Sequence, residues 1–481
     1  MDRKEFFIDG SWAAPIDGDA HQVVEAATGR PLAEAAMAGT ADIDAAVDAA
    51  RRALTGPWGA LGKAERAGLL EKFADELQAR GRETAETVTR ENGMPIRLSK
   101  SVNGFGPAFM MRYYAELICG LDLEEHRPGA AGRRNVVRRE PVGVVAAVTP
   151  WNYPQPLAAM KLAPALAAGC TVVLKPAPET ALDAYAFAEA AAAAGLPGGV
   201  VNVVPGGREA GAHLVAHPGV DKVAFTGSTA AGRAIGETCG RLLRPVTLEL
   251  GGKSVSLVAE DADLDLFSAQ LLNVSLPNNG QTCHAGTRIL APRARYDEVV
   301  EAITETVRGY RVGDPLDRDT QIGPMVSRAQ QRRVLDYIEA GRASDARLTT
   351  GGGVPGDLAE GWFVEPTVFA DVDNKDVIAR EEIFGPVLAV IPYGTLDEAI
   401  EIANDSDYGL GGTVWTADEE KGIEIGRRIR TGTFGVNHYE LDLNAPFGGV
   451  KGSGLGRELG PEGIDPYLVH KSLYLAAPAA P

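Results

Sequence analysis

A cysteine and a glutamate near the middle of the chain carry the functional groups needed for a covalent oxidation. Cys283 ends the run Gly-Gln-Thr-Cys, and it follows Glu249, in Glu-Leu-Gly-Gly-Lys, by 34 residues. A thiolate adds to a carbonyl and creates a tetrahedral thiohemiacetal, from which a hydride can leave. A carboxylate can then activate the water that hydrolyses the remaining thioester. The pair therefore supplies both halves of a covalent oxidation, a thiol to attack a carbonyl and a carboxylate to activate water.

Three other motifs lie around this pair along the chain. Pro-Trp-Asn ends at Asn152, Glu-Ile-Phe-Gly-Pro begins at Glu382, and residues 225–232 read Phe-Thr-Gly-Ser-Thr-Ala-Ala-Gly. The ordered set resembles the NAD(P)-dependent aldehyde dehydrogenase family, of the hydrolytic type that does not acylate coenzyme A. The resemblance runs from about residue 5 to about residue 475 and so covers nearly the whole chain.

The resemblance implies roles for four catalytic residues. Cys283 is the expected nucleophile, and the side-chain amide of Asn152 is expected to hold the oxyanion together with the backbone N–H of Cys283. Glu249 matches the base that activates water, which coenzyme A-acylating relatives lack, so the expected product is a free acid. Glu458 matches a second glutamate proposed to relay protons, although a charged residue there can also simply form a salt bridge.

The remaining cysteines and the histidine beside Cys283 have simpler interpretations. Cys119, Cys170 and Cys239 lie far apart, without the spacing of a metal site or a redox disulfide, and are expected to be small core residues. A protease-like dyad of Cys283 and His284 is excluded, because adjacent side chains point apart. His284 stands where the family more often has a small or apolar residue. A protonated imidazole there would favour the thiolate, whereas a packed or solvated ring would not.

The resemblance also implies a nicotinamide cofactor. The usual Gly-x-Gly-x-x-Gly follows no early strand, but residues 225–232 follow an expected strand and open a helix, whose first N–H groups can hold a pyrophosphate. The expected cofactor-binding residues are Trp151, Lys175, Glu179, Gly227, Ser228, Leu250, Glu382 and Phe384. Within this set Lys175 would bind the adenosine ribose, while Glu382 and Phe384 would hold the nicotinamide ribose and ring. No metal is expected.

One departure from the family affects cofactor choice. Many NAD-preferring members carry a glutamate three residues after the lysine, where this chain has Pro178, with Glu179 next. A displaced carboxylate can still reach the ribose and repel a 2′-phosphate. We therefore expect NAD, and NADP stays open as the alternative.

The expected substrate tunnel is mostly apolar. By resemblance it is lined by Tyr153, Leu157, Met160, Pro277 and Phe447. Gly106 stands where a larger side chain often narrows it, and no arginine is evident to receive a substrate carboxylate. We expect a medium-chain, terpenoid or aromatic aldehyde. The alternatives are a semialdehyde or aminoaldehyde dehydrogenase, for which Glu440 and Asp442 near the entrance could attract a cation, and a catalytically inactive binding or structural relative.

The elements that position these residues follow an α/β pattern. Apolar runs at 142–148, 171–174, 200–204 and 222–225 alternate with helical stretches such as 182–194, which predicts a doubly wound parallel sheet. A second alternating set begins near Gly252 and is expected to hold Cys283. Earlier in the chain, Thr40 is expected to cap a helix whose Ile43, Val47, Ala50 and Leu54 share one face.

The expected fold is therefore that of an aldehyde dehydrogenase. Residues 1–122 and 142–251 would form a Rossmann-type cofactor domain, and residues 252–452 a second α/β catalytic domain. By resemblance, residues 123–141 and 466–481 would form a small sheet that joins subunits into a homodimer or homotetramer. From the residues alone, two surface hairpins fit these segments equally well.

Length and charge narrow the possible partners. The chain has 481 residues and a net charge of -18, which argues against nucleic acid or an anionic membrane as a partner. No stretch reaches the roughly 18 apolar residues needed to span a bilayer, and no signal peptide is evident. The expected location is cytoplasmic, with a small-molecule aldehyde as partner. The last residues, 476–481, are expected to fray.

Overall fold

The computed structural model describes residues 2–476. The chain begins with four strands, which the sequence analysis did not predict: β1 Phe6–Ile8, β2 Ser11–Ala13, β3 Asp19–Glu25 and β4 Arg30–Met37. Five helices follow: α1 Thr40–Thr55, α2 Pro57–Ala60, α3 Lys63–Asn92, α4 Ile96–Ser99 and α5 Gly106–Gly120. Strands β3 and β4 form an antiparallel hairpin of their own, which Arg3 joins through a bridge to Ala35, whereas β1 and β2 add to the first large sheet.

Two expectations for this region are wrong. Helix α1 does begin at Thr40, but its N-cap is Gly39, whose N–H donates to the Asp42 carboxylate at 3.0 Å. Thr40 instead donates its hydroxyl to Asp17. Cys119 is exposed, because it faces solvent on α5 while Ala115 and Ile118 point into the core; Cys170 and Cys239 are buried, as expected.

The first large sheet has eight strands in the order β19-β11-β10-β7-β8-β9-β1-β2. Its five central strands are parallel: β7 Val144–Val148, β8 Thr171–Lys175, β9 Val201–Val203, β10 Lys222–Thr226 and β11 Val246–Glu249. The first four match the predicted runs closely, whereas β11 was not predicted. The chain proceeds from β7 outward through β8 and β9, then returns to the other side of β7 with β10. That reversal creates the crevice where doubly wound sheets bind ligands, at the carboxyl ends of the strands.

Helices cover this sheet. They are α6 Pro154–Ala168, α7 Tyr185–Ala193, α8 Arg208–Ala216 and α9 Thr229–Leu242. The predicted helix at 182–194 starts three residues late, at Tyr185. The reason is that the N–H groups of Leu182 and Asp183 donate to the buried carboxylate of Glu91, at 2.7 and 3.2 Å, in place of helical capping.

The second large sheet has seven strands in the order β14-β15-β16-β13-β12-β17-β18, all parallel except β14. The strands are β12 Val255–Val258, β13 Arg288–Pro292, β14 Arg347–Thr350, β15 Thr367–Ala370, β16 Val387–Tyr393, β17 Gly412–Trp415 and β18 Gly435–Val436. Its helices are α10 Leu264–Ser275, α11 Tyr296–Arg308, α12 Arg328–Ala343, α13 Val377–Arg380, α14 Leu396–Asn404 and α15 Glu419–Arg428. This is the predicted second α/β unit. Strand β19, Gly454–Leu455, crosses back and pairs with β11 of the first sheet.

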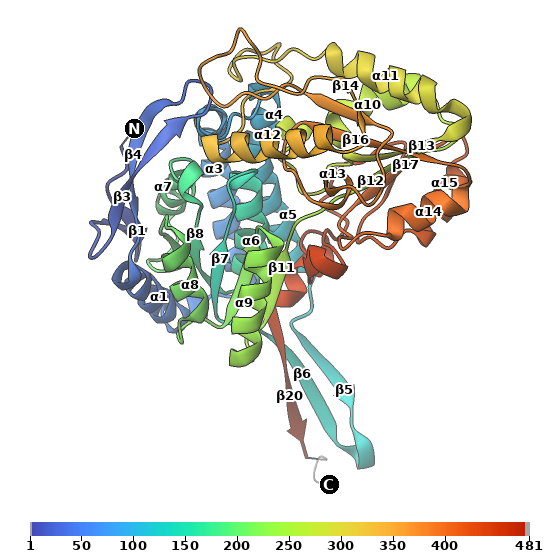
Figure 1. Cartoon of the computed structure of the whole chain (residues 1–481). Helices are drawn as coiled ribbons and strands as arrows, with labels where there is room; N and C mark the ends of the chain where they lie inside the picture. The colour runs from blue at the N-terminus through green and yellow to red at the C-terminus, as the bar shows by residue number, and fades with distance from the viewer. Residues whose placement is uncertain (1, 477–481) are drawn as a thin grey trace.

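A small antiparallel sheet projects from the body like an arm (Figure 1). It consists of β5 Glu124–Pro128, β6 Arg134–Pro141 and β20 Leu468–Leu475, in the order β20-β6-β5. The two segments predicted to pair, 123–141 and 466–481, thus do so over their described residues; residues 477–481 lie outside the described part. Within residues 2–476 no helix is long and apolar enough to cross a bilayer.

Candidate active site

The two large sheets contribute opposite ends of their strands to one site. Asn152 follows β7, Lys175 ends β8, Gly227 follows β10 and Glu249 ends β11, so all four lie at the carboxyl edge of the first sheet. Cys283 precedes β13, and Glu382 and Phe384 precede β16, so the second sheet contributes the amino ends of its strands. The chain crosses between the sheets at Gly251 and Gly252, directly after Glu249.

The loop that carries Cys283 is shaped by two asparagines that the sequence analysis missed. Asn278 and Asn279 have positive φ angles of 49° and 62°, a conformation that asparagine tolerates better than most residues. Asn279 also donates to the carbonyls of Gly93 and Pro324, at 3.0 and 2.9 Å, and accepts from the Gly323 N–H at 2.7 Å. The signal available in the sequence was the Asn-Asn-Gly run, which favours left-handed backbone.

Asn152 lies against this loop. The side-chain N–H of Asn152 donates to the backbone carbonyl of Gln281 at 3.0 Å. The backbone carbonyl of Asn152 accepts from the side-chain N–H of Asn278 at 2.8 Å. The amide carries a second N–H, which is available to a ligand near Cys283. The two segments predicted to form an oxyanion site are therefore in contact.

The surroundings of Cys283 disfavour a thiolate. Burial raises the pKa of the Cys283 thiol well above its usual range, and the negative charges of Glu382 and Glu249 raise it further. The backbone N–H groups of His284 and of Cys283 itself oppose this shift. Cys283 is therefore a thiol at neutral pH, and its sulfur faces two N–H groups that can stabilise developing negative charge. Gly252 lies against the backbone of Cys283. A Cβ at Gly252 would lie 2.2 Å from the Cys283 carbonyl oxygen, so only glycine fits at this position.

Glu249 is buried, with 2% of its surface exposed, and neither carboxylate oxygen has a hydrogen-bond partner among the described residues. Burial raises the pKa of Glu249 well above its usual range, and the nearby charge of Glu458 adds to this, whereas Lys161 and Arg457 oppose it. A buried carboxyl without partners is costly. This is the state expected of a group that accepts a proton from a substrate or a water.

Glu458 forms the salt bridge that the sequence analysis left as its simpler interpretation. Its Oε1 lies 2.8 Å from Nζ of Lys161, and that ammonium also donates to the Thr226 hydroxyl at 2.6 Å. The second oxygen of Glu458 has no partner among residues 2–476 and is buried. Lys161 was not predicted, because its alanine-rich surroundings in α6 give no local sign of a partner 297 residues away.

The residues expected to bind the adenosine part of a cofactor gather at the ends of β8 and β10. The Lys175 ammonium donates to the carbonyls of Pro176 and Gly206, at 2.9 and 2.6 Å. Burial lowers the pKa of Lys175 to about 8, and the opposing charge of Glu179 shows that this carboxylate lies near the ammonium. The carboxylate displaced by Pro178 thus lies close to the residue expected to bind the ribose.

The turn after β10 has the geometry of an anion site. Ser228 is the N-cap of α9, and its hydroxyl accepts from the Ala231 N–H at 3.3 Å. The first N–H groups of the helix have no intrahelical acceptor and point toward bound anions in such turns. Leu250 packs against Gly232 of α9. A Cβ at Gly232 would lie 2.4 Å from a Leu250 methyl carbon. These residues fit a dinucleotide pyrophosphate.

The residues expected to hold the nicotinamide lie on both sides of a shallow hollow lined by Gly252, Thr282, Glu382 and Phe384. Trp151 meets Phe384 edge to face, with ring centroids 5.3 Å apart. The Gly252 N–H donates to Glu382 at 2.9 Å, while burial raises the pKa of Glu382 to about 7. Phe384 has a positive φ of 65°, a strained backbone that turns its ring toward Trp151. The structure thus brings Trp151, Glu382 and Phe384, three of the residues expected to bind the cofactor, to one region beside the Cys283 loop.

The side chains expected in the substrate tunnel share one apolar cluster with Cys283. Leu157, Met160 and Phe447 are buried, and Tyr153 packs against the cluster, as do Leu441 and Leu443, which were not predicted. The Tyr153 hydroxyl lies 2.8 Å from that of Thr282. It is the donor, because Thr282 donates its own proton to the Pro277 carbonyl at 2.9 Å.

Two further details bear on the tunnel. A Cβ at Gly106 would meet nothing closer than 3.9 Å, so the chain leaves open the space that a side chain could fill. Glu440 and Asp442 are exposed, which agrees with a solvated acidic loop.

His284 is packed rather than charged. Its ring centroid lies 5.2 Å from that of Tyr439 and 6.0 Å from that of Phe447. Burial lowers the pKa of His284 to about 4, so the ring is neutral at physiological pH. A neutral ring cannot supply the positive charge that would favour a thiolate, and the packed alternative is the one that the structure bears out.

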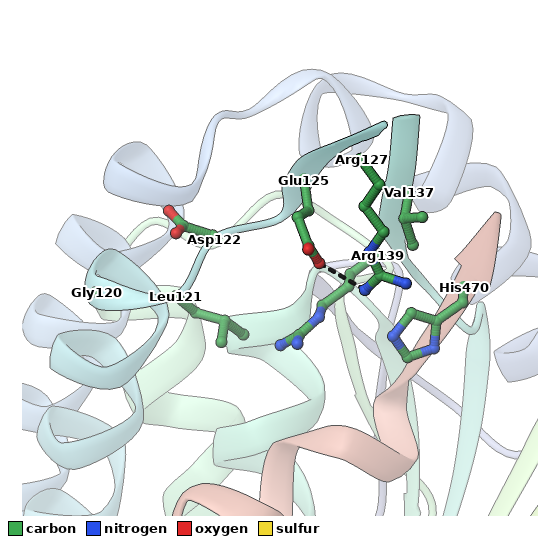
Figure 2. Close-up of a pocket in the computed structure, with 8 residues that line it drawn as sticks. All are labelled: Gly120, Leu121, Asp122, Glu125, Arg127, Val137, Arg139 and His470. Carbon is green, nitrogen blue, oxygen red and sulfur yellow. Dashed lines mark hydrogen bonds and ion pairs between the residues drawn. The ribbon is translucent and has the colours of Figure 1, made fainter. Parts of the chain in front are cut away.

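A pocket and a cluster of titratable side chains lie apart from these residues. Figure 2 shows a pocket of about 360 Å³ at the base of the arm, bounded by the end of α5 and lined by Glu125, Arg127, Arg139 and His470. Elsewhere, Asp44, His213 and His217 come close enough to hold a cation. The Gly219 N–H donates to Nδ1 of His217 at 2.9 Å, so the neutral ring carries its proton on Nε2. That proton faces Asp44, which disfavours a metal there.

Comparison with known proteins agrees with this geometry. The sequence matches the model of the Aldehyde dehydrogenase family over residues 12–473. It is 54% identical over 476 residues to a geranial dehydrogenase of Castellaniella defragrans, covering 99% of both chains. The fold is similar to that of a Mycobacterium tuberculosis aldehyde dehydrogenase complexed with NAD+, with a TM-score of 0.97, 47% identity and coverage of 100% and 99%. An NAD+ complex from Bacillus cereus gives a TM-score of 0.96 at 41% identity, with coverage of 98% and 96%.

These similarities span almost the entire chain. The chain therefore belongs to the aldehyde dehydrogenase family and is an NAD(P)-dependent oxidoreductase.

Proposed function

We propose that the protein oxidises an apolar aldehyde to the free carboxylic acid through a covalent intermediate on Cys283. The thiol loses its proton to solvent as the sulfur adds to the carbonyl carbon, which gives a thiohemiacetal. The free N–H of Asn152 and the backbone N–H of Cys283 hold the oxyanion. A donor of this kind typically contributes about 10² to 10³ in rate. The contact of Asn152 with the Cys283 loop supports this assignment.

Bound NAD would accept the hydride that the thiohemiacetal carbon loses, and Lys175, the start of α9, Glu382 and Phe384 would hold it. Glu179, whose charge acts on Lys175, favours NAD over NADP, since a negative charge near the ribose would repel a 2′-phosphate.

Water then hydrolyses the thioester. Glu249 takes a proton from that water as it attacks the acyl carbon, and the Cys283 sulfur leaves. The unpartnered oxygens of Glu249 support its role as the base. Glu458 and Lys161 would carry the proton onward, because the charge of Glu458 acts on Glu249 and its second oxygen is free.

The observation that carries the substrate class is the apolar cluster around Cys283. The segments that carry the expected tunnel side chains and Cys283, residues 150–160, 280–286 and 439–447, contain no Lys or Arg. The next residue, Lys161, is buried and paired with Glu458. A carboxylated aldehyde would find no counter-ion there. Glu440 and Asp442 are solvent-exposed, so nothing in the cluster favours a cationic aminoaldehyde either. The similarity to a geranial dehydrogenase supports a terpenoid among medium-chain and aromatic aldehydes.

The test is the rate of NADH or NADPH formation across a panel of aliphatic, terpenoid, aromatic, cationic and carboxylated aldehydes, with NAD and NADP in parallel. We expect the highest kcat/KM for an apolar aldehyde with NAD, and no oxidation by Cys283→Ala. Preference for a charged aldehyde would contradict the substrate class, and appreciable activity of Cys283→Ala would contradict the covalent mechanism. Inactivity of the folded wild-type protein with every aldehyde would favour a binding or structural role.

Two structural assignments belong to the same proposal. The arm of β5, β6 and β20 would join subunits into a homodimer or homotetramer. The cofactor domain would comprise residues 1–122 and 142–251, and the catalytic domain residues 252–452, consistent with the division of the strands between two sheets.

A further inference from the structure

A larger hollow than the pocket at the arm lies between the first turns of α12, the turn that joins β3 to β4, and the segment before β15. Its volume is about 630 Å³. Three of its lining side chains are arginines, Arg30, Arg328 and Arg332, and Glu360 is the one acid that lines it. The hollow is therefore cationic, on a chain whose net charge is -18.

The acid of this hollow is already paired. Nη2 of Arg30 lies 3.0 and 2.8 Å from the two carboxylate oxygens of Glu360. Arg328 and Arg332 form no ion pair with any carboxylate of residues 2–476, and α12 has no acid in its first turn. The hollow thus contains two guanidinium groups that no acid of the described chain neutralises.

The placement of these two arginines is unfavourable without a ligand. Arg328 is the first residue of α12 and Arg332 lies one turn later, so their side chains are neighbours on one face. Like charges at this spacing repel, and cations in the first turns of a helix oppose the helix dipole. A bound anion would offset both effects, because it attracts both arginines and lies near the positive end of the helix.

Arg328 is held at the wall of the hollow. Its guanidinium carbon lies 4.7 Å from the ring centroid of Trp362, a cation–π contact. The Trp362 ring in turn packs against the turn between β3 and β4, where a Cβ at Gly29 would lie 3.0 Å from it. The guanidinium is therefore already in position before any ligand arrives, which lowers the entropy lost on binding.

We propose that this hollow binds a small polyphosphate anion, either free or as the phosphate chain of a nucleotide, between Arg328 and Arg332. The planar guanidinium fork matches the oxygens of a phosphate group, so two forks one helical turn apart can each hold one phosphate. Arg328 already occupies one face of the Trp362 ring. The phosphates, rather than a stacked base, therefore supply the affinity.

The hollow is distinct from the expected cofactor site. On the other side of α12, Gln330 donates to the Phe384 carbonyl at 2.8 Å and Arg333 donates to the Glu382 carbonyl at 2.7 Å. The body of the helix thus separates the hollow from the segment expected to hold the nicotinamide. The cofactor pyrophosphate is expected at Ser228, beside the first sheet. Saturation with NAD therefore leaves the hollow free for a second anion.

The experiment is isothermal titration calorimetry of the native protein saturated with NAD, in a phosphate-free buffer of low ionic strength. The probes are pyrophosphate, inorganic phosphate, ATP and adenosine. Arg328→Gln and Arg332→Gln each remove one guanidinium from the hollow. Arg427→Gln, at an exposed position on α15, is the matched control for the change in charge. No aldehyde is present, so the result does not depend on the reaction proposed above.

We expect saturable binding of pyrophosphate to the wild type, tighter than that of inorganic phosphate, and weaker by about 10-fold or more in Arg328→Gln and in Arg332→Gln. Arg427→Gln should bind as the wild type does. ATP that binds while adenosine does not supports recognition of the phosphates. The inference is overturned by the absence of saturable pyrophosphate binding, by equal binding in all variants, or by adenosine that binds as tightly as ATP. Retention of the wild-type rate of NADH formation in both hollow variants shows that they are folded.

Discussion

At the scale of single residues, the active site disfavours the ionised forms of both Cys283 and Glu249. The pKa of Cys283 and that of Glu249 are raised, in each case first by burial. Glu249 serves as a base only when ionised, so a raised pKa moves the active form to higher pH. We expect kcat to rise with pH, and to do so above the range in which an ordinary glutamate ionises. Steady-state assays with a saturating apolar aldehyde measure this, and a flat or falling profile would show that neither ionisation limits turnover.

Glu249 can be separated from the earlier steps by its own substitution. Glu249→Gln keeps the shape of the side chain but cannot take a proton from water. We expect a single-turnover burst of NADH followed by slow turnover, reduced by about 10²- to 10⁴-fold. Stopped-flow absorbance measures both phases. Glu440→Gln, an exposed glutamate on the loop beside Tyr439, is the matched control and should behave as wild type. Full steady-state turnover of Glu249→Gln would remove Glu249 from its assigned role.

At the scale of elements, helix α3 packs closely against the helical turn at residues 100–105, which contains Gly104. A Cβ at Gly81 would lie 2.2 Å from the Gly104 carbonyl oxygen, whereas one at Gly68, in the same helix, would meet nothing within 4 Å. We expect Gly81→Ala to destabilise the protein by about 1 to 3 kcal/mol through overpacking. Gly68→Ala should stabilise it by about 0.5 to 1 kcal/mol. Chemical denaturation measures both, and equal effects would contradict the packing argument.

The end of α3 is also joined to the segment before α7 by two buried acids. Burial and the charge of Asp183 raise the pKa of Glu91, and burial raises the pKa of Asp183 to about 7. Because the folded pKa of Asp183 exceeds the unfolded one, its contribution to stability is lost as pH rises through about 7. Asp183→Asn does not titrate.

Relative to wild type, Asp183→Asn should therefore gain about 1 kcal/mol more stability at pH 8.5 than at pH 6. Thermal melts at the two pH values test this. Asp357→Asn, at an exposed position, should show no such difference. A gain for Asp183→Asn that does not depend on pH would mean that the carboxyl is not protonated in the folded protein.

At the scale of the whole molecule, the arm exposes large apolar side chains that residues 2–476 leave uncovered. Val469, Leu473 and Leu475 share one face of β20, on which Lys471 also lies, and have 41%, 37% and 36% of their surfaces exposed. We expect the native protein to be an oligomer and Leu473→Glu to shift it toward smaller species. Leu266→Glu, at a position 39% exposed on α10, should not. Light scattering after size exclusion measures the mass, and a monomeric native protein would contradict the assignment.

Much of the site could be predicted because its residues sit in short motifs whose backbone chemistry is local. Gly227 and Ser228 follow a strand and precede a helix, and four of the five parallel strands of the first sheet lie within a few residues of their predicted bounds. Errors arose where a distant group altered a local preference. Glu91 delays the start of α7, and Asp17 takes the hydroxyl of Thr40.

The sequence by itself determined which groups react, because a thiol, a carboxylate and an amide have their chemistry wherever they lie. Only the tertiary structure decided their state and their partners. It placed the carboxyl ends of one sheet against the amino ends of the other, paired Glu458 with Lys161 and enclosed His284 between two rings. It also kept Cys283 as a thiol. The physical reason is that protonation depends on burial and on neighbouring charges, which come from segments far apart in the chain.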